Sequence, residues 1–448
     1  MGRAGAAPVS ASARPASPLR PEDPTATAPT TPTDPVASSS RLGRRALAHP
    51  VRTILAAYLV TRLVALTAMW VAATWFQNPA GVGHLDPTVG DLIGLWDSEW
   101  YERIATQGYP VPLPADPTTG KLTYSAWAFY PLFPFLVKGL MLLGIPFTAG
   151  AVALNLVLGA VGAVLIWKLF SHALHADPRP GRDRLALVAA CLWCFYPATG
   201  VMLKAYTEPL AIVLVALSLL QLMNRRYAVV AALAVPLAFT RGVAAAMGCA
   251  VLIHLVVRIR EDRRAGVAPL RGQRSTAALM VLVTGLSGLA WPVVVGVVSG
   301  IPTAFLDVQE AWGQQPSAGP FVLWLQWAWE GHGLAGLAVL VGLCGTYIAL
   351  VLGRHGRWLP VEVRAWAVAY PLYLFAVVRP ITSMWRFLLL DFPLAALLAS
   401  VAMRTSTGER IVTHWRWRVA VLLVPVVLGL VWWTCALLTW TPWSSRPP

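Results

Sequence analysis

Charged residues are scarce in this sequence. Asp, Glu, Lys and Arg make up 12% of its 448 residues, whereas hydrophobic residues make up 57%. A soluble domain carries about 25% charged residues. Apolar runs recur along the chain, each long enough (roughly 18 residues or more) to cross a hydrocarbon core of about 30 Å. The composition therefore excludes an ordinary soluble domain and predicts an all-α, polytopic bundle of transmembrane helices.

Cysteine is also rare, at five residues, and lysine is almost absent. Cys191 and Cys194 form a CxxC pair inside the apolar run LALVAACLWCFYPATG, where packing within a helix explains the spacing better than redox chemistry. The net charge of +15 comes mainly from arginine. The arginines cluster in short segments between apolar runs, which is typical of membrane topology and argues against nucleic-acid binding.

Residues 1–45 are dominated by Pro, Ala, Ser and Thr and lack aliphatic clusters. Such a segment buries too little apolar surface to offset its ordering entropy, so we expect a disordered cytoplasmic tail. The first apolar segment begins near Val51, which is too far into the chain for a cleavable signal peptide. The transmembrane domain is therefore predicted over residues 46–445.

About eleven spans are predicted in the cytoplasmic membrane, with the N-terminus inside and the C-terminus outside. Their approximate bounds are 51–76, 148–169, 185–203, 207–223, 227–240, 243–257, 277–299, 333–352, 364–378, 386–402 and 419–440. This topology places most basic residues in cytoplasmic loops, as the positive-inside rule requires. The apolar segment 126–145 would reverse every later loop if it crossed, so we interpret it as a juxtamembrane or re-entrant helix.

The first outer loop, at about 77–147, is long and rich in aromatic residues. It contains the acidic stretch GDLIGLWDSEWYERIATQGYP at 90–110. A long loop without low-complexity sequence is usually functional. If this stretch is helical from Trp96 onward, Trp96 and Trp100 share one stripe, while Asp97 and Tyr101 share the adjoining one. Asp97 would then face an apolar surface. A solvated helix with an aromatic interfacial belt is the alternative interpretation.

Four ordered blocks lie between residues 96 and 393. They are Trp96-Asp97, Tyr101, Ile104-Ala105 and Gly108-Tyr109 with Ala128-Phe129-Tyr130-Pro131-Leu132-Phe133-Pro134; Tyr196-Pro197-Ala198 with Tyr206-Thr207-Glu208-Pro209-Leu210; Phe239-Thr240-Arg241-Gly242; and Ser383-Met384-Trp385-Arg386-Phe387 with Phe392-Pro393. Together they resemble the bacterial branch of the PIG-V type (glycosylphosphatidylinositol mannosyltransferase II-like) family of GT-C integral membrane glycosyltransferases. The chain departs from that pattern at Glu99 and Trp100, near which many members carry His, and at Trp385, where Pro is common.

The resemblance implies a GT-C-like fold and transfer of mannose from polyprenyl-phosphate mannose to a hydroxyl acceptor on the extracytoplasmic side. In GT-C enzymes an acidic residue early in the first outer loop is the general base, and here that residue is Asp97. A carboxylate within hydrogen-bond reach can accept the proton of a sugar hydroxyl during an inverting displacement. The implied partners are the lipid-linked sugar, membrane lipid and an acceptor that is a glycolipid, a glycan or a protein.

The leaving phosphate needs a cation, and arginine matches phosphate oxygens bidentately. Arg241, Arg379 and Arg386 are predicted near the outer surface, against the positive-inside preference, and Arg386 is the first choice because it lies in a matched block. Snorkelling or pairing with an acidic neighbour is the alternative for each of them. The further substrate-binding candidates are Lys204, Glu208, Trp96, Tyr101 and Tyr130.

Glu208 and Arg62 leave several interpretations open. Glu208 could orient the acceptor, neutralise Arg241 or Lys204, or favour a helix start through the helix dipole. Arg62 lies in the middle of a span, where pairing or snorkelling is expected.

No metal or cofactor is expected. His172, His175 and Asp177 lie in a predicted cytoplasmic loop beside arginines, and the outer His84, Asp86 and Asp91 lack ligand spacing. The alternative function is a transporter or flippase of a lipid-linked saccharide, which would often show an internal repeat and ionisable residues at mid-membrane depth. The sequence has no convincing repeat, and its acidic cluster lies in a loop, which favours the enzyme.

Overall fold

The computed structural model describes residues 46–77, 87–176, 181–267, 271–405 and 411–439. Within these ranges the chain forms helices, turns and two isolated bridges, with no β-strand, which confirms the all-α prediction. The expected disordered tail, residues 1–45, lies outside the described residues.

The helices fall into a long and a short class. The long helices are α2 (Pro50–Val71), α7 (Phe147–Ala176), α8 (Arg182–Cys194), α9 (Glu208–Met223), α10 (Tyr227–Ala238), α11 (Ala244–Arg264), α12 (Arg271–Ser287), α15 (Val322–Leu352), α16 (Val361–Val377) and α19 (Trp415–Ala436). The short ones are α4 (Val89–Gly94), α5 (Asp97–Gln107), α6 (Leu132–Met141), α13 (Ala290–Ser299), α14 (Ala304–Ala311), α17 (Met384–Phe387), α18 (Pro393–Met403), the π-helix η2 (Ala72–Phe76) and the 3₁₀ helices η3 (Ala126–Ala128), η4 (Pro197–Leu203), η5 (Pro316–Ala318) and η6 (Leu388–Leu390).

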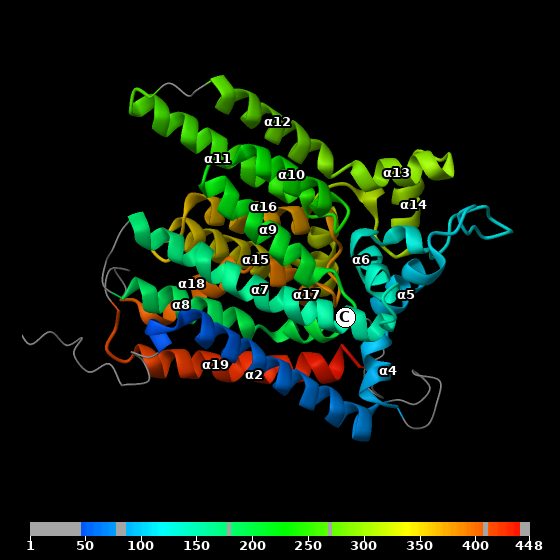
Figure 1. Ribbon diagram of the computed structural model, residues 1–448, viewed down its shortest axis with the longest axis horizontal. Coiled ribbons are helices and arrows are strands. Elements are labelled where there is room, and N and C mark those ends of the chain that lie inside the picture. The colour runs from blue at the N-terminus through cyan, green and yellow to red at the C-terminus, as the bar shows by residue number, and fades with distance from the viewer. Residues whose placement is uncertain (1–45, 78–86, 177–180, 268–270, 406–410, 440–448) are drawn as a thin grey trace, which may run out of the picture. The chain divides into compact units, whose positions relative to one another are not determined.

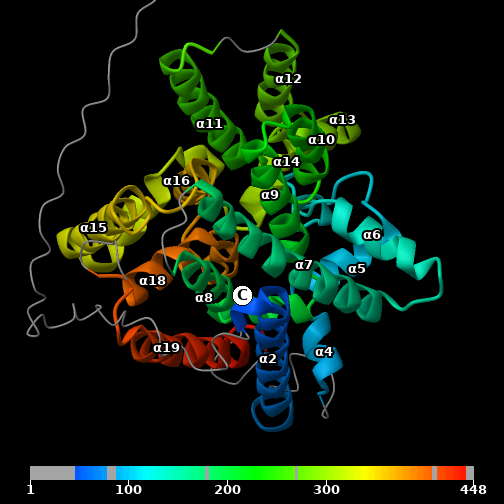
Figure 2. The same ribbon diagram turned by 60° about the vertical axis from the view of Figure 1, so that its left-hand side comes forward.

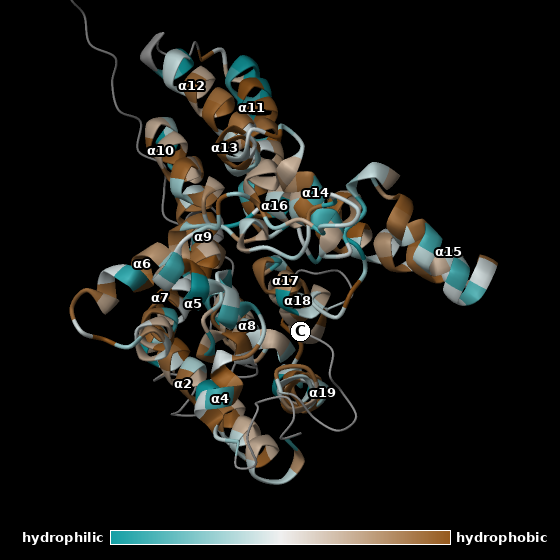
Figure 3. Ribbon diagram, turned by 90° about the vertical axis from the view of Figure 1, so that its right-hand side faces the viewer, coloured by the Kyte–Doolittle hydropathy of each residue, from teal (hydrophilic) through white to brown (hydrophobic). Residues whose placement is uncertain are grey.

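Several helices are apolar on all sides, which is the pattern of a membrane protein. Among the described residues, four helices are long and apolar enough to cross a membrane, and the number of spans rises to as many as seven if each of three bent pairs counts as one. The four are Pro50–Phe76, Phe147–His172, Val322–Leu352 and Trp415–Ala436. Hydrophobic colour covers most of α2, α15 and α19 (Figure 3). All eleven predicted spans coincide with a helix or a bent pair, but the number that cross stays a prediction.

Three helix pairs bend sharply. Asp183–Cys194 meets Pro197–Leu203 at 66°, Gln273–Ser287 meets Ala290–Ser299 at 52°, and Met384–Leu390 meets Pro393–Met403 at 81°. Two of the second members begin at a proline, which cannot continue the preceding hydrogen-bond ladder. A bend leaves backbone carbonyls without helical partners, and in an apolar interior these carbonyls need other donors.

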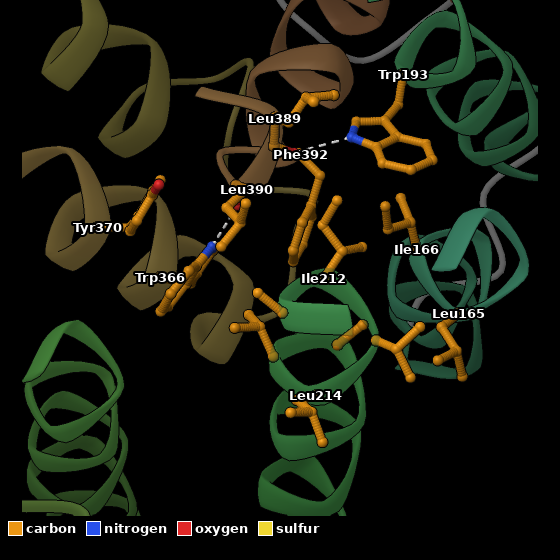
Figure 4. Close-up of a cluster of buried hydrophobic side chains, with 14 of the residues drawn as sticks. Leu165, Ile166, Trp193, Ile212, Leu214, Trp366, Tyr370, Leu389, Leu390 and Phe392 are labelled. Carbon is orange, nitrogen blue, oxygen red and sulfur yellow. Dashed lines mark hydrogen bonds between the residues drawn. The ribbon is translucent and has the colours of Figure 1, made fainter. Parts of the chain in front are cut away.

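The sharpest bend is held by the hydrophobic core. Trp193 of α8 and Trp366 of α16 donate their indole N–H groups to the carbonyls of Leu389 (3.0 Å) and Leu390 (2.7 Å), as Figure 4 shows. The hydroxyl of Tyr370 donates to the carbonyl of Phe387 at 2.7 Å. These three bonds fix the segment that directly follows Arg386.

The bend between α8 and η4 has its own polar supports. Arg62 of α2 is buried and donates to the carbonyl of Thr199, and its guanidinium lies 4.9 Å from the ring centre of Tyr58. This contact is the buried pairing expected for Arg62. Beyond η4, the side-chain amide of Asn155 donates to the carbonyls of Lys204 (2.7 Å) and Tyr206 (2.8 Å).

The short helices between residues 89 and 141 gather with α13 and α14 at one end of the long helices (Figure 1). An aromatic cluster joins them, with ring centres 4.5 Å apart for Tyr109 and Trp127 and 5.6 Å apart for Trp127 and Trp291. Helix α6 has ten residues and so rises about 15 Å, half of a hydrocarbon core. A helix of this length does not span the core by itself, and the re-entrant placement of 126–145 stays a prediction.

Helix α15 lies on the flank of the bundle, beside α16 (Figure 2). Polar bonds attach it at both ends. The indole N–H of Trp324 donates to the carbonyl of Val378 at 2.7 Å, and the hydroxyl of Tyr347 lies 2.8 and 2.9 Å from the two carboxyl oxygens of Asp391.

Candidate functional site

Two arginines and two carboxylates from distant parts of the chain meet in one cluster. Arg386 Nη1 lies 2.7 Å from Asp97 Oδ2 and 3.0 Å from Glu208 Oε1. Arg241 Nη1 lies 2.8 Å from the same oxygen of Glu208. We call Asp97, Glu208, Arg241 and Arg386 the charged quartet. Its two positive and two negative charges balance.

The quartet lies largely out of contact with solvent. The exposed side-chain fractions are 0% for Glu208, 8% for Arg386, 16% for Arg241 and 17% for Asp97. Removing ions from water is unfavourable unless partners compensate them, so each member depends on the others. Glu208 Oε2 and Arg386 Nε are buried and have no hydrogen-bond partner among the described residues. The cluster therefore retains unused bonding capacity.

The position of Asp97 depends on a sharp turn at Trp96. Trp96 has φ 68° and ψ −127°, a conformation that L-residues rarely adopt, and such residues cluster at functional sites. Helix α5 begins at Asp97, so the expected helical stripe of Trp96 and Trp100 is wrong. Trp96 instead packs against the cluster that contains Leu92 and Leu95. The turn directs Asp97 toward Arg386, whereas Glu99 is exposed.

Glu208 and Arg241 are brought together by fixed connections. Glu208 is the first residue of α9, and the preceding segment is tied to α7 by the bonds from Asn155. Arg241 lies in the turn between α10 and α11, as predicted, and donates from Nη1 to the hydroxyl of Thr207 at 3.0 Å. The turn is joined to α6 because the backbone N–H of Leu132 donates to the carbonyl of Phe239 at 2.9 Å.

Gly242 allows this turn to lie close to two tyrosines. A Cβ atom at this position would lie 2.7 Å from Tyr373 Oη and 3.2 Å from Tyr130 Oη, so a side chain would displace them. The small residue after Arg241 thus lets the arginine approach the aromatic surroundings of the quartet.

Aromatic rings flank both guanidinium groups. Phe387 has Arg241 at 4.6 Å and Arg386 at 4.9 Å from its ring centre, and Arg386 also lies 4.9 Å from the ring centre of Tyr206. Such contacts stabilise cations and fix the plane of the guanidinium. Tyr101, one turn after Asp97 on α5, is buried, and this burial raises its pKa well above the usual range. Its phenol therefore stays neutral at physiological pH.

The structure brings most of the sequence candidates together. Asp97, Glu208, Arg241 and Arg386 form the quartet, while Tyr101 and Tyr130 border it. Glu208 neutralises Arg241, which was one of the alternatives for this residue, and it also contacts Arg386 rather than Lys204.

Three candidates are not members of the quartet, although two of them lie beside it. Trp96 directly precedes Asp97, and the ammonium of Lys204 lies 5.9 Å from the ring centre of Tyr206, which also flanks Arg386. Arg379 is exposed and donates to the carbonyl of Gly313 at 3.3 Å, away from the quartet. Lys204 is fully buried, and its ammonium donates to the carbonyls of Leu92 and Leu438, which ties α4 to the segment after α19. Trp96 supports the turn before Asp97.

Sequence reasoning did not single out Tyr206, Thr207 or Phe387, which contact the quartet. All three lie inside the matched blocks within two positions of a predicted residue, and that proximity was the available signal. Asn155 lies outside these blocks, between the first and the second, and no feature of the sequence indicated that it supports the site.

Metal ligands do not gather in the part of the chain that the structure describes. No group of three or more His, Cys, Asp or Glu side chains there could hold a metal ion. His84, Asp86 and Asp177 fall outside the described residues, as does the side chain of His175. The expectation that the protein needs no metal stays a prediction.

No protein-family profile matches the chain, and no curated protein sequence matches it. Structural comparison finds the Archaeoglobus fulgidus oligosaccharyltransferase in complex with Zn and sulfate, with a TM-score of 0.43, 12% identity, and coverage of 88% of this chain and 53% of that chain. The same protein tethered to an acceptor peptide containing the NVT sequon gives a TM-score of 0.40, 14% identity, and coverage of 88% and 56%. This chain thus spans about half the length of those chains. Such low scores establish no shared activity, so the function has to be argued from the site itself.

Proposed function

We propose that the protein is a membrane glycosyltransferase that transfers mannose from polyprenyl-phosphate mannose to a hydroxyl acceptor on the extracytoplasmic side. The observation that carries the proposal is the contact of Arg386 with both Asp97 and Glu208. It puts a carboxylate that can accept a proton beside two guanidinium groups that can bind a phosphate. The sequence blocks that resemble the PIG-V type family contain all four members of the quartet.

The reaction is a single displacement. The acceptor oxygen forms a bond to C1 of mannose while the bond from C1 to the phosphate oxygen breaks. Asp97 takes the proton of the acceptor hydroxyl, and polyprenyl phosphate leaves with the electron pair of the broken bond. Attack opposite to the leaving group inverts C1, so a β-linked donor gives an α-mannoside.

The arginines stabilise the charge that grows on the leaving phosphate. Preorganised cations act most strongly where water is excluded. Both guanidinium groups are largely buried, that of Arg386 against Tyr206 and Phe387 and that of Arg241 against Phe387. The positive charge therefore comes from the protein itself, and the proposal includes no metal ion or cofactor.

The test measures transfer of labelled mannose from polyprenyl-phosphate mannose in membranes that contain wild-type protein, Asp97→Asn or Asp91→Asn. Asp91 is a matched control because its carboxylate caps α4, accepting from the backbone N–H of Thr88 at 2.8 Å and from its hydroxyl at 2.6 Å. We expect Asp97→Asn to lower the rate by about 100-fold or more, the usual contribution of a general base. Asp91→Asn should transfer at nearly the wild-type rate.

Two results would contradict the proposal. Full activity in Asp97→Asn would show that the base lies elsewhere. If wild-type protein moved the lipid-linked sugar across vesicles without forming a labelled product, the protein would be a transporter or flippase of a lipid-linked saccharide.

A further inference from the structure

The proposed base is already bonded in the ligand-free protein. Asp97 Oδ2 lies 2.7 Å from Arg386 Nη1, the shortest of the three ionic contacts in the quartet. Arg386 already occupies Oδ2, the oxygen that an acceptor hydroxyl would have to approach within about 2.6–3.2 Å to give up its proton there. Under the proposed mechanism, Asp97 must therefore leave Arg386 before it can act.

Arg386 is held more firmly than Asp97. The rings of Tyr206 and Phe387 flank its guanidinium, and Glu208, which is fully buried, binds the same Nη1 atom. The carbonyl of Phe387 is itself fixed by Tyr370. Asp97 lies on the first turn of a short helix and is one of the two most exposed members of the quartet. When one partner leaves Arg386, the structure favours the departure of Asp97.

The charges of the quartet lead to the same expectation. The two arginines of the quartet balance its two carboxylates. A bound phosphate diester adds one negative charge, which no member of the quartet compensates. If the phosphate takes the place of one carboxylate on Arg386, the guanidinium remains paired with an anion. The displaced carboxylate then loses its cation. Glu208 is buried among both arginines, whereas Asp97 contacts one of them.

We infer that the donor phosphate displaces Asp97 from Arg386, so that donor binding produces the free base and has to precede activation of the acceptor. This inference rests on the proposed function, since it assumes a phosphate-linked donor. Without donor, Asp97 stays bonded and leaves the acceptor hydroxyl protonated. After transfer, polyprenyl phosphate departs and Arg386 returns to Asp97.

The first test measures binding of farnesyl monophosphate, a short isoprenyl phosphate without sugar, to purified protein in detergent. If Asp97 competes with the phosphate for Arg386, Asp97→Asn should bind the probe about tenfold more tightly, since one charge-assisted hydrogen bond no longer has to break. Asp91→Asn, the matched control, should bind it as the wild type does. Unchanged or weaker binding by Asp97→Asn would overturn the inference.

A double-mutant cycle separates exchange from simple repulsion between Asp97 and the phosphate. In an Arg386→Gln background, exchange predicts that Asp97→Asn gives no further gain, because the shared cation is absent. A gain of similar size in both backgrounds would mean repulsion alone and would refute the exchange.

The third test is a structure of the wild-type protein with farnesyl monophosphate bound, which requires no substitution at Arg386. The inference expects Asp97 Oδ2 to lie more than about 4 Å from Arg386 Nη1, beyond ion-pair distance. Retention of the contact would overturn it.

The two proposals fail separately. Loss of transfer without tighter probe binding in Asp97→Asn refutes the exchange alone, whereas full transfer by that variant refutes the proposed function.

Discussion

Glu208→Gln is the most informative perturbation of the quartet, because it removes one charge and almost no volume. Glu208 Oε1 accepts bonds from Arg241 at 2.8 Å and Arg386 at 3.0 Å, and its side chain has no exposed surface. In the variant Arg386 keeps Asp97 as its anion, while Arg241 keeps just the hydroxyl of Thr207 among its described partners. The uncompensated charge is therefore that of Arg241.

The expected loss of stability follows from that charge. Breaking a buried ion pair by removing one partner typically lowers the free energy of unfolding by about 3–5 kcal/mol. Arg241 is 16% exposed and so retains some contact with solvent, which favours the lower end of about 3 kcal/mol. Removing Arg241 as well should recover most of this loss, because one cation and one anion then disappear together.

The assay is thermal unfolding in detergent, followed by tryptophan fluorescence, for Glu208→Gln, Arg241→Gln and the double variant. We expect Glu208→Gln to unfold several degrees below the wild type and the double variant to unfold between the two. Glu208→Asp, which keeps the charge on a shorter stem, should lie closer to the wild type than Glu208→Gln. The reasoning is refuted if Glu208→Gln unfolds like the wild type, or if the double variant is no more stable than Glu208→Gln.

Two further substitutions test the surroundings of the quartet. Trp366→Phe removes the indole N–H that donates to the buried carbonyl of Leu390, so the free energy of unfolding should fall by about 1–3 kcal/mol in chemical denaturation. The rate of mannose transfer should also fall, because Arg386 lies on the same segment as Leu390. Unchanged stability would show that the bend does not need this donor. Arg379→Ala should change the free energy of unfolding by no more than about 0.5 kcal/mol and leave the rate of transfer unchanged, since Arg379 is exposed and bonds to Gly313. A large increase in the KM for the donor would instead place Arg379 in the site.

The helices could be predicted closely from the sequence. All eleven expected spans coincide with a helix or a bent pair, although a span needs about 20 residues and helices such as Glu208–Met223 and Tyr227–Ala238 are shorter. Trp96 was placed wrongly inside α5, because the helix start depends on a positive φ that a tryptophan rarely adopts and that periodicity does not encode. Charge placed against the positive-inside preference singled out Arg241, Arg379 and Arg386, but it did not show that Arg241 and Arg386 join the quartet while Arg379 is exposed. Pairing between distant segments is a property of the tertiary structure, and so the contacts of Thr207 and Phe387 became visible only there.

The buried polar residues near the bends explain why the quartet, and not another intramembrane polar group, carries the proposed chemistry. A polar side chain inside a span is by default a functional candidate. The side chains of Arg62, Trp193 and Trp366, however, donate to backbone carbonyls at or beside the bends. Asn155 donates to carbonyls of the irregular segment that follows η4. Their role is therefore to stabilise irregular backbone, which an apolar interior requires.

The quartet shows the opposite arrangement. Its arginines donate mainly to carboxylates, and the bonds of Trp193, Trp366 and Asn155 hold the segments that carry Arg386 and Glu208 in place. Buried charge of this kind is often no more stabilising than an apolar packing of the same volume, so stability alone does not account for it. Binding of an anion does account for it, because two guanidinium groups that share one carboxylate oxygen can accept a phosphate by exchanging a single partner. Asp97 lies at the start of α5 and contacts one of the two arginines, so it is the partner that the geometry offers for this exchange.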